Sequence, residues 1–174
     1  MKYLVKFFVV TFLTLIYTYA SAEQNIKYLD LKFVLNNSKA GKGAQDFLQK
    51  SFKTNQKNFL DKENALKKAE SNLLKQKTIL SKEEYQKQSD DLRKKVIDYQ
   101  SQRRASLEKI TTQRAEARQK LLEKLDPIMK TYIDENGISL VVDKKNILMG
   151  NTDLDITNII IKKLNKELAS LSIK

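Results

Sequence analysis

The sequence predicts an α+β protein in which a long α-helical hairpin, a coiled-coil arm, projects from a small β-body. Two observations predict the arm: residues 44–126 contain no Gly and no Pro, and apolar side chains recur there at heptad spacing. A third predicts the body, because short β-type runs bracket the arm at both of its ends in the sequence. The expected division is 1–22 as a signal peptide, 23–43 and 127–174 as the oligomerisation body, and 44–126 as the arm.

Residues 1–22 have the pattern of an export signal. Lys2 and Lys6 form a basic start, Leu4 to Tyr19 is mostly apolar without an acidic residue, and Ala20-Ser21-Ala22 offers the small residues that a signal peptidase accepts. We expect cleavage after Ala22 and export of a mature chain, and an uncleaved membrane anchor is the alternative. No later stretch of the sequence is apolar enough to span a bilayer.

The segment after the signal predicts a strand that leads into the arm. Alternation of apolar and polar residues indicates a short strand near Ile26 to Leu31. Leu31 to Leu35 could form a helical turn or continue the strand. Asn36-Asn37-Ser38, Gly41 and Gly43 are expected to break the pattern before the arm begins.

The arm is predicted from two apolar columns. In its first half one heptad position is apolar throughout, while the intermediate position is mostly polar. The apolar column is Phe52, Phe59, Leu66, Leu73 and Leu80, and the intermediate one is Asn55, Lys62, Ala69 and Gln76. The return half keeps the spacing with polar interruptions, through Leu92, Val96, Tyr99, Arg103, Ser106, Ile110, Ala117, Leu121, Leu125 and Ile128. Phe47, Phe52, Phe59, Tyr85 and Tyr99 could be seam residues or could face a cavity.

Capping signals divide the helical block. Ser81 with Glu84 three residues later is a capping box, which indicates a new helix and therefore a hairpin turn near residue 81. A single long rod is the alternative. Asp126-Pro127 suits a helix start, so we expect a kink or restart there. Asn136-Gly137 is expected to end the helix.

The last part of the sequence predicts the rest of the body. Ile138 to Val142 and Ile147 to Met149 are expected to be strands joined by a hairpin turn at residues 143–146. A helix then starts near Asp153 or Asp155. Its apolar face is Ile156, Ile160, Leu164 and Leu168. So small a sheet has exposed edges, which oligomerisation would remove. The expected oligomerisation core is Ile26, Tyr28, Leu140, Val141, Val142, Ile147 and Met149.

The charge distribution favours anionic partners. The chain has a formal net charge of +12, and residues 50–130 hold 21 Lys and Arg against 12 Asp and Glu. Because the mature chain is expected to be exported, nucleic acid is the least expected anionic partner. Anionic lipid and acidic protein segments are expected ahead of it. The cations around the hairpin end are either a solvated face or a contact surface for a client protein or anionic lipid. They are Lys67, Lys68, Lys75, Lys77, Lys82, Lys87, Arg93, Lys94 and Lys95.

Catalytic chemistry is not indicated. The sequence has no Cys and no His, which removes the commonest general base and the commonest metal ligand. It also has no Gly-rich phosphate loop, nucleophile motif or metal-ligand spacing. We therefore expect no enzyme, no cofactor and no metal.

Three stretches resemble the Skp/OmpH family of periplasmic chaperones. They are "YLDLKFVLNNSKAGKGAQDFLQ", "SKEEYQKQSDDLRKK" and "ISLVVDKKNILMGNTDLDITNIIIKKL", and together they cover the start, the turn and the end of the mature chain. The resemblance implies a homotrimer whose β-barrel body carries three arms around a cavity. That cavity would hold unfolded outer-membrane proteins in the periplasm, without ATP. Anionic lipid or lipopolysaccharide would be a further partner.

Two other functions compete with a chaperone: a structural or adaptor coiled coil of the cell envelope, and a basic binder of anionic lipid. The polar intermediate column discriminates among them. A dedicated structural coiled coil would have an optimised seam, whereas an arm that opens around clients of different size does not need one.

Overall fold

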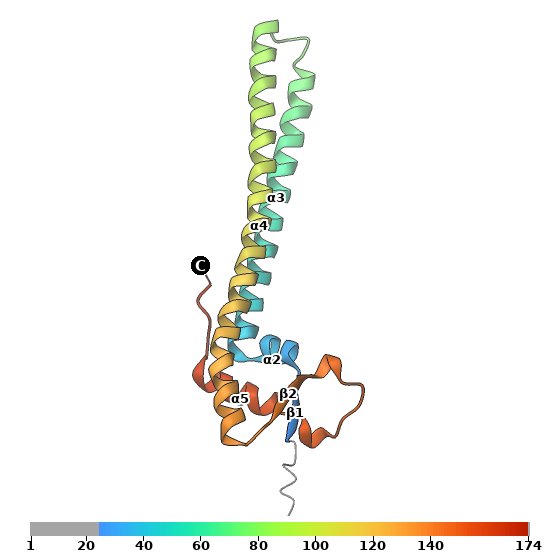
Figure 1. Cartoon of the computed structure of the whole chain (residues 1–174). Coiled ribbons are helices and arrows are strands. Elements are labelled where there is room, and N and C mark those ends of the chain that lie inside the picture. Colours follow the sequence, from blue (N-terminus) through green and yellow to red (C-terminus); the bar gives the residue numbers. More distant parts are fainter. Residues whose placement is uncertain (1–24, 174) are drawn as a thin grey trace, which may run out of the picture.

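The computed structural model describes residues 25–173, so the predicted signal peptide lies outside the described residues. Figure 1 shows one long helical hairpin rising from a small body in which the remaining elements gather. The elements are β1 (Ile26–Leu29), α2 (Leu31–Asn37), α3 (Lys39–Lys75), α4 (Lys82–Glu135), β2 (Leu140–Asp143), the 3-10 turns η1 (Lys144–Asn146) and η2 (Thr152–Leu154), and α5 (Thr157–Glu167). Within the described part, no helix has the length and apolar character needed to cross a bilayer.

The sheet contains two parallel strands. β1 pairs with β2 in a register that begins with Ile26 opposite Leu140, and Tyr28 makes one further bridge to Asp155. Parallel strands need a crossover connection, and here the connection is α2 and the whole arm. The body therefore forms from both ends of the described chain, as the bracketing runs predicted.

The predicted second strand of a late hairpin is wrong for the single chain. Residues 147–149 form no strand in the described structure, and residues 143–146 form no hairpin turn. Asp143 instead accepts a hydrogen bond from the Lys145 amide and starts η1. The chain instead turns through η1 and is held beside β1, because Lys144 pairs with Asp155, the residue that bridges to Tyr28. The outer edge of β2 therefore gains no third strand in the described structure.

The predicted break before the arm is confirmed at Asn36-Asn37-Ser38, where α2 ends and α3 begins, but it is wrong at Gly41 and Gly43, which lie inside α3. The helix begins directly after Ser38, whose buried hydroxyl accepts a hydrogen bond from the Gly41 amide at 3.1 Å. A Cβ on Gly41 would collide with the carbonyl oxygen of Leu35, whereas one on Gly43 would meet open space. Gly41 therefore permits close packing of α2 against the start of α3.

The helix restart expected at Asp126-Pro127 does not occur, since α4 runs unbroken through Pro127. Proline removes one backbone donor from the helix interior, but this turn is exposed, so water can satisfy the freed carbonyl. Asp126 pairs with Lys130 one turn later, at 2.7 Å, and does not cap a new helix. The predicted end at Asn136-Gly137 is confirmed, with Gly137 at φ +55°.

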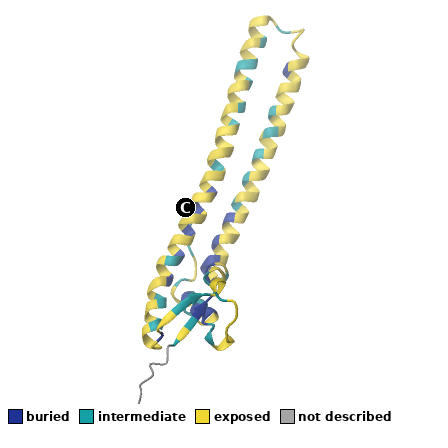
Figure 2. Cartoon of the chain, turned by 45° about the vertical axis from the view of Figure 1, so that its right-hand side comes forward, coloured by how far each residue is buried: buried dark blue, intermediate teal, exposed yellow. Residues whose placement is uncertain are grey.

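The hydrophobic core lies in the body. The expected apolar face of α5 is confirmed, because Ile156, Ile160 and Leu164 are at most 2 % exposed. They pack with residues of α2 and with Leu121 and Leu125 at the base of α4. Figure 2 shows burial concentrated at this end, while most of the hairpin surface is exposed. The body thus anchors the arm by one end only.

Candidate interaction surfaces of the arm and the body

The hairpin turn lies where the sequence places it. α3 ends at Lys75, and α4 begins after Ser81, whose hydroxyl oxygen accepts a hydrogen bond from the Glu84 amide. The predicted seam of the return arm is confirmed except at Arg103, which is exposed. The buried or half-buried members are Leu92, Val96, Tyr99, Ser106, Ile110, Ala117, Leu121, Leu125 and Ile128.

On α3 the predicted seam is only partly correct. Phe59, Leu66 and Leu73 are half-buried or buried against α4, but Phe52 is 43 % exposed. Ser51 and Asn55 take the seam positions around Phe52, and the Asn55 amide donates a hydrogen bond to Ser106 Oγ at 2.8 Å. Phe52 is therefore turned off the seam because a polar pair closes it at that turn.

Polar side chains hold the middle of the arm together. Lys62 Nζ donates to Gln102 Oε1 at 2.7 Å, and the Tyr99 hydroxyl donates to Glu63 Oε2 at 3.2 Å. The Tyr99 ring also packs edge-on against Phe59, with ring centroids 6.0 Å apart. Lys67 binds Glu63 at 2.8 Å, and this hydrogen bond lowers the pKa of Glu63. Such exposed polar contacts stabilise a seam only weakly.

Two shallow hollows flank this polar stretch. One, of about 450 Å³, is lined by Phe52, Leu60 and Leu107 together with polar residues of both helices. The other, of about 550 Å³, lies nearer the tip and is lined by apolar residues such as Leu66 and Leu92 beside several charged side chains. The arm surface is therefore an alternation of apolar and charged groups around open hollows.

The sequence left the role of five aromatic residues open. Phe59, Tyr85 and Tyr99 are half-buried seam residues, whereas Phe47 and Phe52 are exposed. The exposed aliphatic residues of the arm were not singled out in advance. They are Leu60, Leu74, Ile79, Ile97 and Leu107. Their positions outside the 3-4 columns were the available signal, but isolated exposed aliphatic residues are common, so this signal is weak.

The nine predicted contact cations do not form one cluster. Lys75, Lys77 and Lys82 surround the turn at the tip, and Lys87 lies further along α4. Lys67 and Lys68 lie on the α3 shaft, and Arg93, Lys94 and Lys95 lie on α4. Within the described residues only Lys67 and Lys94 of this set form ion pairs. The tip therefore presents cations without acidic partners.

The predicted oligomerisation residues divide into two groups. Tyr28 is buried in its own chain, Val141 packs on the core, and Val142 and Ile147 are half-buried. The exposed group is Ile26 at 38 %, Leu140 at 53 % and Met149 at 89 %. Leu148, which the sequence list omitted, is 96 % exposed.

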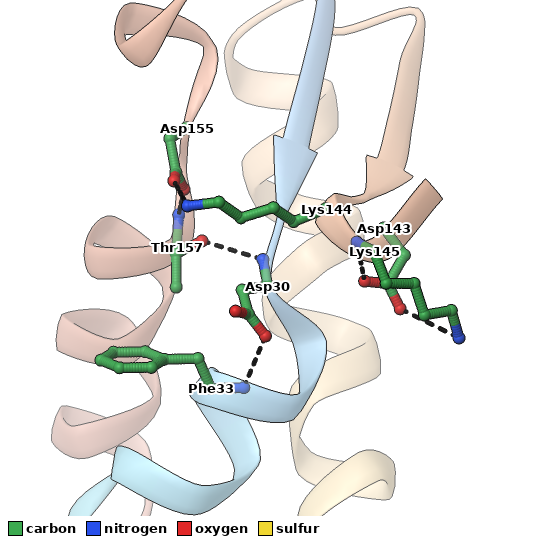
Figure 3. A network of polar contacts seen from close by, with 7 residues as sticks. All are labelled: Asp30, Phe33, Asp143, Lys144, Lys145, Asp155 and Thr157. Atoms are coloured by element: carbon green, nitrogen blue, oxygen red, sulfur yellow. Dashed lines mark hydrogen bonds and ion pairs between the residues drawn. The ribbon is translucent and has the colours of Figure 1, made fainter. Parts of the chain in front are cut away.

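A polar network fixes the loop that presents these side chains (Figure 3). Lys144 Nζ lies 3.0 Å from Asp155 Oδ2, and Asp155 Oδ1 accepts the Thr157 amide at 2.9 Å. The Asp30 amide donates to Thr157 Oγ1 at 2.9 Å, which joins the end of β1 to the start of α5. The Lys144 ammonium also lies 5.7 Å from the centre of the Tyr28 ring.

The network has a structural role. Burial raises the pKa of Asp155, but hydrogen bonds from Thr157 and Lys144 outweigh this, and the pKa lies below its usual value. Hydrogen bonding to Asp155 raises the pKa of Lys144. Both groups therefore stay charged and paired near neutral pH. No group of acidic residues in the described part of the chain is arranged to hold a metal ion.

Comparison with known proteins identifies relatives of the whole arrangement. The family model described as "Outer membrane protein (OmpH-like)" matches residues 25–164, which include both strands and the complete arm. A crystal structure from Caulobacter crescentus, provisionally assigned as an OmpH-like outer membrane chaperone, superposes with a TM-score of 0.80. The two sequences are 16% identical over 89% of this chain and 92% of that one, so the likeness concerns the fold. Among curated proteins, none matches the chain.

Proposed function

Because the chain belongs to the OmpH-like family of outer membrane proteins, we propose that it is an ATP-independent holdase chaperone of the periplasm. Its clients would be unfolded outer-membrane proteins, which it keeps from aggregating before they insert into the membrane. The observation that carries this proposal is the apolar surface of the arm. Phe52, Leu60 and Leu107 line one hollow and are exposed. The two helices close beside them through the hydrogen bond between Asn55 and Ser106, which does not require their burial.

This surface suits a client that has no fixed shape. Apolar side chains offer non-directional attraction, and the open hollows accept side chains of different size. Neighbouring cations, including the unpaired ones at the tip, would attract acidic segments and speed the encounter. Many weak contacts of this kind hold a chain without folding it, and they need no cofactor and no catalytic group.

We place the oligomer contact on the body. Leu148 and Met149 protrude from the loop after η1, and Ile26 and Leu140 are exposed on the paired strands. Burying these side chains between copies would remove apolar surface from water, and residues 147–149 could then gain the strand partner that a single chain lacks. A homotrimer with a closed β-barrel body would satisfy both, with three arms enclosing the client cavity.

A double substitution tests the arm surface. Phe52→Ser with Leu107→Ser should strongly reduce the protection of a urea-diluted porin against aggregation, measured by light scattering. Both side chains are exposed, so the fold should persist in circular dichroism. The matched control is Phe33→Ser with Ile159→Ser, which removes equally exposed apolar side chains from the body. Equal protection by the two variants would reject the arm hollow as the client surface.

A single substitution tests assembly. Leu140→Asp places a charge on a side chain that is exposed in the single chain, so the body should fold while the oligomer dissociates. Analytical ultracentrifugation should then report a trimer for the unaltered protein and a monomer for the variant. Leu74→Asp on the arm is the control and should remain trimeric. A monomeric unaltered protein at micromolar concentration would contradict the assembly proposal.

Anionic lipid is a second candidate partner, favoured by the arm tip. Ile79 is 79 % exposed and lies between Lys77 and Lys82 in the sequence, and neither lysine is ion-paired within the described structure. An exposed apolar side chain among cations is suited to the interface of a negatively charged bilayer. Sedimentation with anionic and neutral vesicles tests this, and binding to both alike would exclude a charge-based contact.

A further inference from the structure

The chain after α5 returns toward the arm. Residues 168–173 leave the end of α5 and run beside α4, as Figure 1 shows. Leu168 and Leu171 pack against the core cluster that includes Leu121 and Leu125 of α4. This segment lies beyond residues 25–164, which the family model matches.

The segment has the pattern of a half-buried strand. Leu171 and Ile173 are half-buried, while Ser170 and Ser172 between them are exposed. Alternate side chains therefore face the arm base, as they would in an extended segment lying on a surface. The segment is not a strand, because no partner strand lies beside it in the described structure.

Among the described residues, side-chain packing is what holds this segment in place. The Leu168 amide donates to the Leu164 carbonyl and so ends α5. In the described chain, no hydrogen bond and no ion pair involves residues 169–173. Partly buried apolar contacts without backbone hydrogen bonds can separate locally while the rest of the body stays folded. The surface beneath the segment can therefore become free without unfolding α5.

We propose that this surface at the arm base is a binding site for an extended client segment with alternate apolar residues, and that residues 168–173 occupy it in the client-free protein. The proposal rests on the proposed chaperone function. Strands of outer-membrane barrels alternate apolar and polar side chains, and Ser170-Leu171-Ser172-Ile173 has the same alternation. A client strand would displace the segment by presenting the same apolar face to the same surface.

Occupation by the segment lowers the apparent affinity for the client. The apparent dissociation constant equals the intrinsic constant divided by the fraction of molecules in which the site is free. If the segment covers the site in about nine molecules out of ten, its removal should tighten binding about tenfold. Leu171→Ser with Ile173→Ser should act in the same direction, because it removes the apolar contacts and keeps the length of the chain.

A label on the segment tests displacement directly. The chain has no cysteine, so Ser172→Cys accepts a single nitroxide spin label. Addition of a urea-diluted porin to the intact labelled protein should sharpen the electron paramagnetic resonance spectrum, because the label moves more freely once the segment has left the arm base. Asn158→Cys on the exposed face of α5 is the control label and should not respond. The same client is then titrated into a protein that ends after Leu168 and into the Leu171→Ser, Ile173→Ser variant.

The outcomes separate this proposal from the proposed function. A response at residue 172 with tighter binding by both variants supports the inference. Client binding with no response at residue 172 and unchanged affinity in both variants overturns it and leaves the chaperone function standing. Weaker binding together with a lower melting temperature in both variants also overturns it, because the segment would then be a brace. If none of the proteins binds the client, the chaperone function fails and the inference fails with it.

Discussion

The body and the arm are stabilised by different kinds of contact. The body buries Ile156, Ile160 and Leu164 almost completely, and its buried polar groups have partners within the described structure. The arm runs through two long helices but closes its middle with part-buried and exposed hydrogen bonds and leaves hollows beside them. The difference indicates that the body fixes the architecture, whereas the arm retains exposed apolar surface, which the proposed function assigns to a client. Substitutions in the two regions should therefore have unequal effects on stability and on capture.

The largest expected effect is a cavity in the body. Ile160→Ala should destabilise the protein by about 3 kcal/mol, because the side chain is fully buried and the surrounding residues cannot collapse around the void. Ile97→Ala on the arm is the control, and it should change the free energy of unfolding by less than about 0.5 kcal/mol. Urea denaturation measures both. Similar decreases in the free energy of unfolding for the two variants would contradict the distinction between a packed body and a lightly packed arm.

A smaller contrast lies where the two regions join. Gly41→Ala should cost about 2 kcal/mol, since its Cβ would meet the Leu35 carbonyl oxygen and force α2 away from α3. Gly43→Ala should stabilise the helix by about 0.5–1 kcal/mol, because alanine is the better helix former and its Cβ meets nothing. The two melting temperatures should therefore move in opposite directions. A destabilising Gly43→Ala would contradict the open environment assigned to that position.

The polar network of the body predicts a pH dependence. The lowered pKa of Asp155 means that its carboxylate stabilises the fold fully above its ordinary value of 3.8, and that this contribution is lost as the pH falls through the lowered value. Asp155→Asn should cost about 1 kcal/mol at pH 7, and the difference from the unaltered protein should shrink below pH 3.8. Asp153→Asn is the exposed control. A constant difference across the acid range would show that the charge is irrelevant.

Tightening the seam should separate stability from function. Asn55→Leu with Ser106→Ala replaces a part-buried hydrogen-bonded pair by apolar side chains, a change that is neutral or stabilises by about 0.5–1 kcal/mol. We expect the melting temperature to hold or rise while protection of a large porin falls, because the arm adapts less readily. Unchanged protection would show that the polar seam does not serve client binding.

The smallest expected effect concerns charge on the arm. Replacing Lys75, Lys77, Lys82 and Lys87 by Gln should slow capture of a labelled porin about threefold at 0.05 M salt, because charge mainly steers the encounter. Raising the salt to 1 M, where the Debye length is about 3 Å, should slow the unaltered protein similarly. A control with Lys32, Lys42, Lys162 and Lys166 replaced by Gln carries the same net charge and alters only exposed lysines of the body. Equal stopped-flow rates for all three proteins would show that the tip lysines do not steer capture and only keep the protein soluble.

Local patterns allowed the sequence to predict most of the helical architecture. The Ser81 cap located the turn, 3-4 spacing identified the α4 seam, and Gly137 ended the helix. Errors arose where the outcome depended on contacts between separate elements. Glycine usually breaks a helix, yet Gly41 is needed inside α3 because a larger residue would collide with the Leu35 carbonyl oxygen. Residues 147–149 have a strand pattern without a partner strand in the single chain.

The candidate surfaces were less predictable than the fold. Phe52 occupies an apolar heptad column in the sequence, but Asn55 and Ser106 close the seam at that turn and leave it exposed. A one-dimensional pattern cannot decide between an apolar and a polar closure of the same turn. The packing of residues 168–173 on the arm base was not anticipated either, because a short apolar alternation is compatible with many positions.

The parallel pairing of β1 and β2 has a consequence for the order of folding. Ile26 pairs with Leu140, 114 residues later in the chain, so the sheet cannot form until the entire arm has been synthesised. Loop-closure entropy grows slowly with length, at about 0.6 kcal/mol for each doubling, and a hairpin that zips from its tip brings the two distant ends together. Formation of the arm should therefore precede formation of the sheet. Extending or shortening the arm by matched heptads would move the tip yet leave the strand register untouched, so arm length can vary independently of the body.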